Sequence, residues 1–377
     1  MRVAVVGAGP AGSFLALRLA RDGAHVVVFD ASHPREKPCG GGITAKALDL
    51  LPKAPPDDPL PARRVGACRF ESGAGEAVEL SLTRPVAVAA RLDLDAWLLR
   101  RARSAGAAHV AERVVEVDAS GRVRTAAREE RFDVVVGADG AGSLVRRTFL
   151  GPVPSDRLTV AAGWFSPGTS PMLVRFTPGV EGYLWLFPRP DHVGVGICAP
   201  LASVPTRELL ARLEREALRS FPALAGDGRP RYAHTIPSPS ADPRSIREVS
   251  GGRWALVGDA AALADPITGE GIYYALRSAA LLADALREDG SPARYTERLL
   301  ADCGRDLLKA ASIRARFYAP GFTRRMVDYG ARSRAIREVL ADLVLGDQGY
   351  VGLRRRLLRA GPAFLWQAAV SRLVSAA

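Results

Sequence analysis

Three glycines and one carboxylate near the start of the chain have the types and spacing needed to hold a dinucleotide. An apolar β run is separated from a helix by Gly7, Gly9 and Gly12, and the next apolar run ends on Asp30, 18 residues after Gly12. Such glycines permit a tight turn, a close approach of backbone to a pyrophosphate, and close packing of helix on strand. The helix N-terminus offers unpaired N–H groups to phosphates, and Asp30 can accept hydrogen bonds from a ribose diol.

A second glycine turn lies far along the chain, in GDAAALADPITGEGI at residues 258–272. Asp259 directly follows a strand, so it can accept hydrogen bonds from a polyol at the carboxyl edge of a parallel sheet. Gly269, Glu270 and Gly271 open the next helix, whose N–H groups would stabilise negative charge on an electron-rich ring. Either turn alone could be structural, but the pair favours one bound cofactor.

The periodicity of apolar residues predicts the elements that position these turns. Strand, glycine turn, helix and strand follow one another over residues 2–30, which is typical of a parallel sheet covered by helices. Four strand-like runs separated by Pro and Gly fill residues 158–199 and predict a largely antiparallel sheet. Residues 110–117 and 121–125 are expected to form a hairpin.

We therefore predict an α/β fold in three units. A Rossmann-like domain for the cofactor is discontinuous, and its three parts are residues 1–55, 91–150 and 250–290. A mostly antiparallel β-sheet domain for the substrate is inserted within it and comprises residues 56–90 and 151–249. Residues 291–377 are predicted to form a helical C-terminal tail.

Composition limits the classes of partner. The net charge is +12, and 48 of the 52 basic residues are arginine. Residues 305–359 hold 13 Lys or Arg against 5 Asp or Glu, a local net charge of +8. Peripheral contact of this basic region with an anionic membrane face is one interpretation, and solvated helix faces are equally consistent with it. No nucleic acid is expected, because no recognised binding motif accompanies the charge.

Other features point to a reduced, cytoplasmic protein. The four cysteines are scattered without the spacing of metal ligands, so no metal site is expected. A strand begins at residue 2, which leaves no room for a signal peptide. No apolar run of 18 or more uncharged residues occurs, so no transmembrane helix is expected.

Together the two glycine motifs resemble those of the glutathione-reductase-type FAD proteins, in the branch that contains aromatic hydroxylases and geranylgeranyl reductases. The branch's DG element is present at residues 136–143, followed by Arg146 and Arg147. The resemblance implies that Arg91 reaches the FAD phosphates or ribose, although a surface arginine is the alternative, and that Val114 touches the adenine edge. The implied FAD contacts are Gly7, Gly9, Ala11, Gly12, Asp30, Cys39, Gly40, Gly42, Arg91, Val114, Asp259, Gly269, Gly271 and Ile272.

Further stretches resemble the geranylgeranyl reductases more narrowly. PREKPCGGGIT, ending at residue 44, is similar to their Cys-Gly-Gly loop beside the flavin, and GYLWLFPRPDHVGVGIC is similar to their G-Y-x-W-x-F-P strand. The tail GDQGYVGLRRRLL is also similar to theirs, so the resemblance spans nearly the whole chain. It implies a reductase that saturates C=C bonds of a polyprenyl chain. Its substrate would be a lipid, a quinone such as menaquinone, or a chlorophyll-like ester, and NAD(P)H is the expected electron donor.

This chemistry needs a proton donor, because no carbonyl stabilises a carbanion when hydride adds to an isolated alkene. Cys39, in a glycine loop whose backbone can approach the ring, is the candidate catalytic donor. Alternatively, Cys39 is simply a small residue that fits beside the flavin. Tyr183 and Trp185 alternate on one strand and are the candidate substrate contacts, with plain sheet core as the alternative.

Two other functions remain open. A flavin monooxygenase or halogenase could use the same fold with an aromatic substrate. Halogenases of this branch use a lysine in the channel, and none of the four lysines lies in a recognisable halogenase context. A prenyl-binding escort that has lost flavin would not be an enzyme, and the intact Gly7, Gly9, Gly12, Asp30 and Asp259 argue against it.

Overall fold

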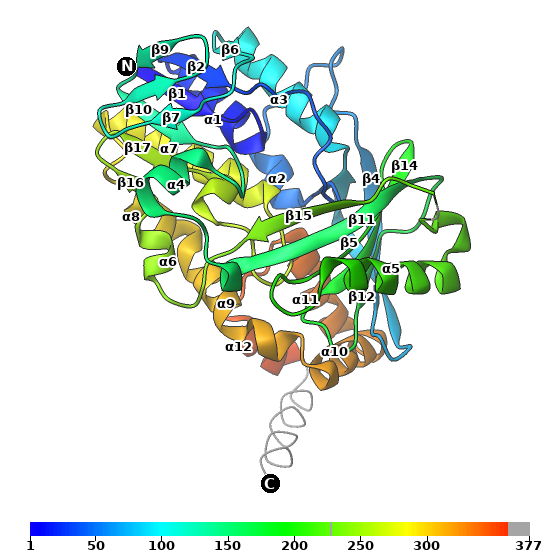
Figure 1. Cartoon of the computed structure of the whole chain (residues 1–377). Helices are drawn as coiled ribbons and strands as arrows, with labels where there is room; N and C mark the ends of the chain where they lie inside the picture. Colours follow the sequence, from blue (N-terminus) through cyan, green and yellow to red (C-terminus); the bar gives the residue numbers. More distant parts are fainter. Residues whose placement is uncertain (227, 361–377) are drawn as a thin grey trace.

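The computed structural model describes residues 1–226 and 228–360, which form two large sheets and a group of C-terminal helices (Figure 1). The first sheet has the strand order β16-β17-β10-β1-β2-β6, and every neighbouring pair is parallel except β16 with β17. Its strands are β1 (Arg2–Val6), β2 (His25–Phe29), β6 (Ala108–Val110), β10 (Val134–Gly137), β16 (Ser250–Gly251) and β17 (Trp254–Leu256). The predicted Rossmann-like sheet, drawn from three parts of the sequence, is confirmed.

The strand order brings the glycine turns together. β10 lies between β17 and β1, so the turns that follow these three parallel strands meet at one edge of the sheet. Residues 3–6 and 26–29 are buried, because helices cover both faces of a parallel sheet and the strands must be apolar throughout. α1 packs against both α3 and α7. The helices of this half and its connections are α1 (Pro10–Arg21), α2 (Ala45–Leu50), α3 (Arg91–Ser104), α4 (Leu144–Leu150), α6 (Arg244–Arg247) and α7 (Ile272–Asp289). α5 (Thr206–Ser220) instead packs on β11 and β14 of the second sheet.

The second sheet has eight strands in the order β15-β11-β14-β13-β12-β4-β5-β3. All its neighbouring pairs are antiparallel except β12 with β4, so the predicted, mostly antiparallel sheet is confirmed. Residues 42–43 already belong to it, and the domain boundaries given above stay a prediction. Its strands are β3 (Gly42–Ile43), β4 (Arg63–Glu71), β5 (Ala77–Val88), β11 (Leu158–Pro167), β12 (Leu173–Phe176), β13 (Tyr183–Pro188), β14 (His192–Pro200) and β15 (Tyr232–Pro237).

The expected hairpin of residues 110–117 with 121–125 is only partly right. Residues 108–110 form β6 and pair in parallel with β2 at the edge of the first sheet, where Asp30 N–H also donates to Val110 O at 3.1 Å. The hairpin proper is shorter, with β7 (Glu116–Val117), β8 (Arg122–Arg124) and β9 (Glu129–Arg131) in a separate three-stranded sheet. Pairing with a strand about 80 residues earlier overrides the local alternation on which the prediction rested.

The C-terminal region is helical through residue 360, as predicted, and residues 361–377 of that prediction lie outside the described part. Its elements are α8 (Tyr295–Leu299), a π-helical turn (Leu300–Gly304), α9 (Arg305–Phe317), α10 (Pro320–Arg332), α11 (Arg334–Leu345) and α12 (Leu353–Ala360). α10 and α11 pack on β5, where Val78 and Leu80 meet Met326 and Leu340 in one apolar cluster. Within the described chain, no helix has both the length and the apolar character required to span a bilayer.

Candidate functional site

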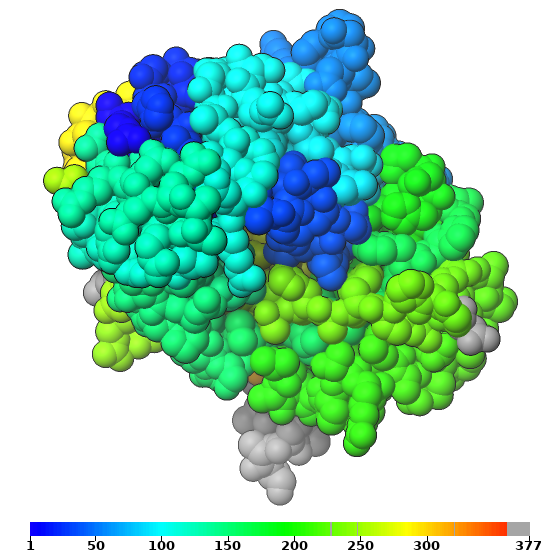
Figure 2. All heavy atoms as spheres, turned by 45° about the horizontal axis from the view of Figure 1, so that its top comes forward, coloured from blue at the N-terminus to red at the C-terminus, as the bar shows by residue number. Residues whose placement is uncertain are grey.

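A cavity of about 1000 Å³ lies between the two sheets and the C-terminal helices. The space-filling view shows a narrow recess where blue surface of the N-terminal region meets green and yellow-green surface (Figure 2). Every residue predicted from the sequence to contact cofactor or substrate lines the cavity, except Gly12. Those that line it are Gly7, Gly9, Ala11, Asp30, Cys39, Gly40, Gly42, Arg91, Val114, Tyr183, Trp185, Asp259, Gly269, Gly271 and Ile272.

In the first glycine turn, positions 7 and 12 have no room for a side chain. Gly7 has φ +105°, and a Cβ there would lie 2.4 Å from the Ala138 carbonyl oxygen. A Cβ on Gly12 would lie 1.9 Å from the Gly7 carbonyl oxygen, so Gly12 holds α1 against the end of β1 rather than touching a ligand. Gly9 is the N-cap of α1, where no side chain caps the first N–H groups and no acidic residue occupies the first turn. These N–H groups suit an anion such as a pyrophosphate.

Asp30 is held ready to accept further hydrogen bonds. Its Oδ2 accepts from Ala8 N–H at 2.9 Å, and its Oδ1 accepts from the N–H and the hydroxyl of Ser32 at 2.8 and 2.7 Å. Burial alone would raise its pKa, but these hydrogen bonds outweigh burial and hold the pKa of Asp30 below its usual value. An ionised carboxylate at the end of β2 can bind a ribose diol.

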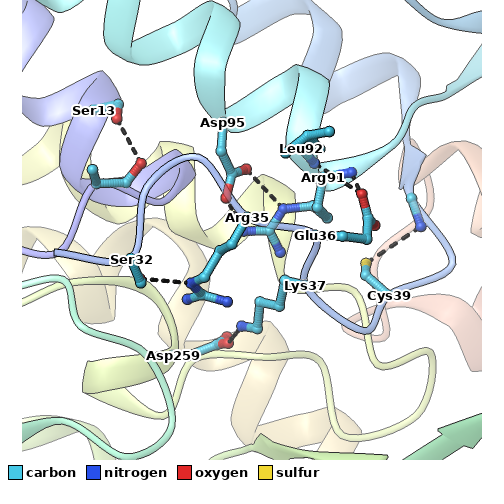
Figure 3. A network of polar contacts seen from close by, with 12 residues as sticks. Ser13, Ser32, Arg35, Glu36, Lys37, Cys39, Arg91, Leu92, Asp95 and Asp259 are labelled. Carbon is cyan, nitrogen blue, oxygen red and sulfur yellow. Dashed lines mark hydrogen bonds and ion pairs between the residues drawn. The ribbon is translucent and has the colours of Figure 1, made fainter. Parts of the chain in front are cut away.

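Arg91 is a buried residue at the cavity, 6% exposed, and not a surface arginine. Its Nε and Nη2 donate to the two carboxylate oxygens of Asp95 at 2.8 and 2.7 Å (Figure 3). Although burial opposes the charge, this bidentate pair raises the pKa of Arg91. A fixed cation therefore faces the same cavity as the uncapped start of α1.

Lys37 and Asp259 form an ion pair that the sequence did not reveal. Lys37 Nζ lies 2.7 Å from Asp259 Oδ2, and both side chains line the cavity (Figure 3). Burial would raise the pKa of Asp259, but the Lys37 ammonium outweighs burial and lowers it. The neighbouring His234, on β15, also lines the cavity, and its Nε2 is buried without a hydrogen-bond partner in the described chain.

The second glycine turn is tied to α2. Glu270 accepts a hydrogen bond from Thr44 Oγ1 at 2.5 Å and lies 3.3 Å from Lys46 Nζ. Burial raises the pKa of Glu270. Gly271 is the N-cap of α7 and, like Gly9, carries no side-chain cap. Free N–H groups therefore open toward the cavity at two helix starts, one at each glycine motif.

Three tyrosines from distant segments hold residues 265–268, immediately before that turn. The hydroxyls of Tyr183 and Tyr318 donate to the carbonyl oxygens of Thr268 and Ile267, and Tyr350 donates to Asp265 Oδ1 at 3.1 Å. Asp265 Oδ1 also accepts from Ile267 N–H at 2.7 Å and Thr268 N–H at 2.9 Å. Sequence reasoning assigned no role to Tyr318 or Tyr350. No local pattern marks Tyr318, whereas Tyr350 lies in the GDQGYVG stretch, whose similarity was a signal that could have found it.

The part of the cavity between the second sheet and the C-terminal helices is apolar, and we call this part the apolar chamber. The second sheet forms one wall, and α9, α10, α11 and the segment before α12 form the other. The sequence indicated the strand that carries Tyr183 and Trp185 but gave no sign of the helical wall. The chamber residues are Cys68, Phe70, Val86, Met172, Val174, Phe176, Phe317, Tyr318, Met326, Leu340, Leu343, Val344 and Tyr350.

The residues present fit a flavin dinucleotide. A Cβ on Gly9 would be in van der Waals contact with Arg91 Nη2 at 3.7 Å and Asp95 Oδ2 at 3.9 Å, so the cation lies directly beside the glycine turn that would contact a phosphate. The ionised Asp30 and Asp259 follow the carboxyl ends of β2 and β17, two parallel strands of the first sheet, where a ribose and a polyol can bind. The donors for the negatively charged groups are the uncapped helix starts at Gly9 and Gly271.

The half-buried His234 predicts a pH-dependent stability. Burial, together with the nearby Lys37 charge, lowers the pKa of His234 to about 4, against about 6.5 in an unfolded chain. Between these values the unfolded chain binds the proton and the folded chain does not, so stability is full above about pH 6.5 and falls as the pH drops toward 4. From pH 7 to pH 5.5 we expect His234 to contribute a loss of about 1 kcal/mol in urea unfolding, so the loss in a His234→Gln variant should be smaller by that amount.

The groups that act on His234 electrostatically are Lys37, Asp259, Arg35 and Arg91, of which Asp259 alone favours its protonated form. The matched control is His25→Gln, because His25 is exposed at the start of β2. His25→Gln should keep the pH response of the wild type. The same response in His234→Gln would show that His234 is not held neutral in the fold.

Comparison with known proteins supports FAD as the cofactor. The family model described as "FAD binding domain" matches residues 1–216. The menaquinone reductase of Mycobacterium tuberculosis (strain ATCC 25618 / H37Rv) is 32% identical over 330 residues, covering 80% of this chain and 79% of that protein. The geranylgeranyl diphosphate reductase of Synechocystis is 29% identical over 320 residues, covering 76% and 75%.

Solved structures share the fold. A geranylgeranyl bacteriochlorophyll reductase-like protein from Thermoplasma acidophilum matches with a TM-score of 0.76 and 19% identity, covering 97% of this chain and 98% of that one. A flavin-dependent brominase matches with a TM-score of 0.72 and 17% identity, covering 95% and 99%. The cofactor motifs, the two-sheet fold and the curated relatives agree, so the chain belongs to the geranylgeranyl reductase family of FAD-dependent oxidoreductases.

Proposed function

We propose that this enzyme saturates carbon–carbon double bonds in the polyprenyl chain of a lipid, a quinone or a chlorophyll-like ester. The observation that carries the proposal is the apolar chamber, which opens from the same cavity as the cofactor residues. Among the described residues, none of the chamber side chains carries a charge at neutral pH. A prenyl chain presents only methyl, methylene and alkene groups, so it can fill such a space without leaving a polar group unpaired.

The proposed reaction needs a hydride source and a proton donor, and the residues of the cavity suggest which group serves as each. Bound FAD, once reduced by the electron donor, would supply the hydride that adds to one alkene carbon. Cys39 lines the cavity and would deliver the proton to the other carbon from its Sγ. The hydroxyls of Tyr183, Tyr318 and Tyr350 are already bonded to residues 265–268, so they would line the chamber without competing for that role.

An anaerobic experiment tests the proposal. The purified flavoprotein is reduced with dithionite, prenyl lipids are added one at a time, and flavin reoxidation is followed at its visible absorption band. Menaquinone, a geranylgeranyl lipid and a geranylgeranyl chlorophyll ester are the substrates to compare. We expect at least one to reoxidise the flavin and to gain two hydrogens by mass spectrometry. No reoxidation by any of them would contradict the proposal.

A monooxygenase or halogenase is the alternative outcome. Lys37 does line the cavity, but its Nζ is 2.7 Å from Asp259 Oδ2, on the side of the first sheet rather than in the apolar chamber. Oxygen uptake with an oxygenated or halogenated aromatic product, and no prenyl reduction, would favour that alternative. The escort alternative has lost its basis, because the family is one of oxidoreductases.

We propose NAD(P)H as the electron donor, although no second dinucleotide motif accompanies the first. The same anaerobic assay tests this point when NADH or NADPH replaces dithionite. Bleaching of the flavin by either nucleotide would support the proposal. Bleaching by dithionite alone would favour a protein carrier such as a ferredoxin.

We also propose a peripheral contact between α12 and an anionic membrane face. Arg354, Arg355 and Arg359 are exposed, and none has a carboxylate partner in the described chain, while Leu358 beside them is 40% exposed. Replacing the three arginines with glutamate should reduce sedimentation with vesicles containing phosphatidylglycerol by at least about 10-fold, since each basic side chain near such a surface is worth about 1 kcal/mol. Binding equal to the wild type would exclude this contact.

The control for α12 is a triple variant with the same change in charge. Arg103, Arg207 and Arg215 are exposed and lie on α3 and α5. Their replacement by glutamate should reduce vesicle binding much less than the α12 variant does. An equal effect of both variants would mean that total charge, and not the surface of α12, governs the association.

A further inference from the structure

Arg189 lies in the turn between β13 and β14 and is a buried cation far from the first sheet in sequence. Its side chain is 0% exposed. Nη2 donates to the Cys39 carbonyl oxygen at 2.7 Å, and Nη1 lies 2.9 Å from Glu36 Oε1. The guanidinium carbon also lies 4.4 Å from the centre of the Phe165 ring. The Arg189 side chain therefore contacts Glu36 and Cys39, the two ends of the segment 36–39.

Glu36 connects this cation to the helix that carries Arg91. Its Oε2 accepts from Leu92 N–H at 3.0 Å, and its Oε1 accepts from Arg91 N–H at 3.3 Å (Figure 3). The N-cap residue of α3, Ala90, cannot cap these N–H groups with its own side chain. Glu36 therefore serves as the cap of α3 from 55 residues away in sequence, and its charge suits the positive end of the helix dipole.

The loop of residues 39–41 is closely packed, which restricts the backbone of Cys39. Gly41 has φ +85°, and a Cβ there would lie 2.1 Å from the Ala89 carbonyl oxygen. Gly41 O accepts from Ala89 N–H at 3.0 Å, and Gly41 N–H donates to Cys39 Sγ at 3.3 Å. A Cβ on Gly40 would lie 2.6 Å from the Phe187 ring. The loop is thus held against the start of α3 on one side and β13 on the other.

We infer that Arg189 and Glu36 form a buried clamp that fixes the Cys39 backbone and the N-terminus of α3 as one unit. The clamp would fix the position of the Cys39 thiol relative to Arg91 and to Phe187, which also lines the cavity. Arg189 and Glu36 act through other residues, so both are positioning residues. The inference deepens the proposed function, because it assigns the placement of the proposed proton donor.

The arrangement is specific to arginine. A planar guanidinium can donate to a carboxylate and a carbonyl at once, whereas a lysine ammonium on a flexible stem cannot span both. A buried cation that loses its one carboxylate partner is strongly destabilised, so each half of the clamp depends on the other. His192 Nε2 also lies 3.1 Å from Arg189 Nη1, and His192 Nδ1 is itself paired with Asp191 at 2.6 Å. Arg189 Nε is buried without a hydrogen-bond partner in the described chain.

Hydrogen exchange of the purified protein, followed by mass spectrometry of peptides, tests the clamp without any lipid. In Arg189→Lys, amide exchange in residues 36–43 and at the start of α3 should accelerate together by about 10- to 30-fold. Glu36→Gln keeps the shape of the side chain but removes the carboxylate partner of Arg189, so it should give the same pattern at least as strongly, and it tests the clamp independently where Arg189→Lys does not fold. FAD titration by fluorescence should show a Kd about 10-fold higher in both variants, because Arg91 sits at the freed helix end.

Arg175→Lys is the matched control. Arg175 lies on β12 of the same sheet and pairs with Glu71 at 2.7 Å and Glu216 at 3.2 Å. Its replacement should leave exchange in residues 36–43 and the Kd for FAD at wild-type values. Wild-type exchange of residues 36–43 in both clamp variants would overturn the inference, and so would faster exchange of the loop with an unchanged start of α3.

Steady-state turnover distinguishes a positioning role from general destabilisation of the fold, because the two differ in their effects on kcat and KM. With a prenyl substrate that the wild type reduces, Arg189→Lys should lower kcat about 10-fold or more and change KM less than about twofold, because the chamber walls are untouched. A fall in kcat accompanied by a comparable rise in KM would contradict a positioning role. If no prenyl lipid is reduced even by the wild type, the exchange and FAD measurements still decide whether the clamp exists.

Discussion

A Gly12→Ala variant is expected to purify with little or no flavin and to unfold more readily than the wild type. Alanine is the better helix former by about 1 kcal/mol, so propensity alone would favour the change. However, the new Cβ would lie 1.9 Å from the Gly7 carbonyl oxygen, which belongs to backbone and cannot swing away. α1 must therefore move off β1, at a cost of about 3 kcal/mol that exceeds the gain in propensity.

The displacement matters most at the start of α1, where the uncapped N–H groups face the cavity. We expect the affinity for FAD to fall at least about 100-fold, which corresponds to about 3 kcal/mol of binding free energy. Flavin content is read from the ratio of visible to ultraviolet absorbance, and stability from urea unfolding of the apoprotein. The free energy of unfolding should fall by about 2 kcal/mol.

Gly252→Ala is the control for this prediction. Gly252 has no atom within 4 Å of an added Cβ and no positive φ, and it lies between β16 and β17. It should bind FAD as the wild type does. If Gly12→Ala also purified fully yellow, the close packing of α1 on β1 would not be what holds the phosphate site.

The parts of the fold that the sequence predicted are those in which neighbours in sequence are neighbours in space. Residues 2–30 form β1, α1 and β2, because the apolar runs, the glycine turn and the helix periodicity are all local. The same holds for the hairpins of the second sheet around residues 158–199. The expected hairpin at residues 110–125 was partly wrong, because β6 pairs with β2 and this choice depends on residues about 80 positions away.

The candidate site divides in the same way. Gly7, Asp30 and Asp259 were found from short motifs, and the parallel arrangement of β1, β2 and β17 in one sheet brings them to one cavity. Lys37 was named only as a lysine without context, because its partner Asp259 lies 222 residues away. Arg189 could not be assigned, since its bond to the Cys39 carbonyl spans 150 residues and a lone arginine after a Pro carries no pattern.

A Cys39→Ala variant should keep its flavin and lose most of its turnover. Within the described chain the thiol makes one hydrogen bond, from Gly41 N–H at 3.3 Å, so its removal should disturb the loop little. Delivery of a proton by a positioned side chain contributes about 100- to 10,000-fold to a rate. We expect kcat for prenyl reduction to fall about 100- to 1,000-fold, with the Kd for FAD within about twofold of the wild type.

Separate half-reactions locate the defect. Reduction of the Cys39→Ala flavin by dithionite should match the wild type, whereas anaerobic reoxidation by the prenyl lipid should be slow in stopped-flow absorbance. Cys303→Ala is the matched control, because Cys303 is buried outside the cavity and burial raises the pKa of its thiol to about 12. Cys303→Ala should reoxidise at the wild-type rate.

The outcome decides between the two roles that the sequence left open for Cys39. If Cys39→Ala reduces alkenes at full rate, the residue serves only as a small side chain beside the ring, and a bulkier Cys39→Val should then be the damaging change. If Cys39→Ala is slow and Cys39→Ser recovers part of the rate, a hydroxyl of similar size can carry the proton less well. Such an order of rates, Cys above Ser above Ala, follows from proton delivery and not from packing, because alanine is the smallest of the three.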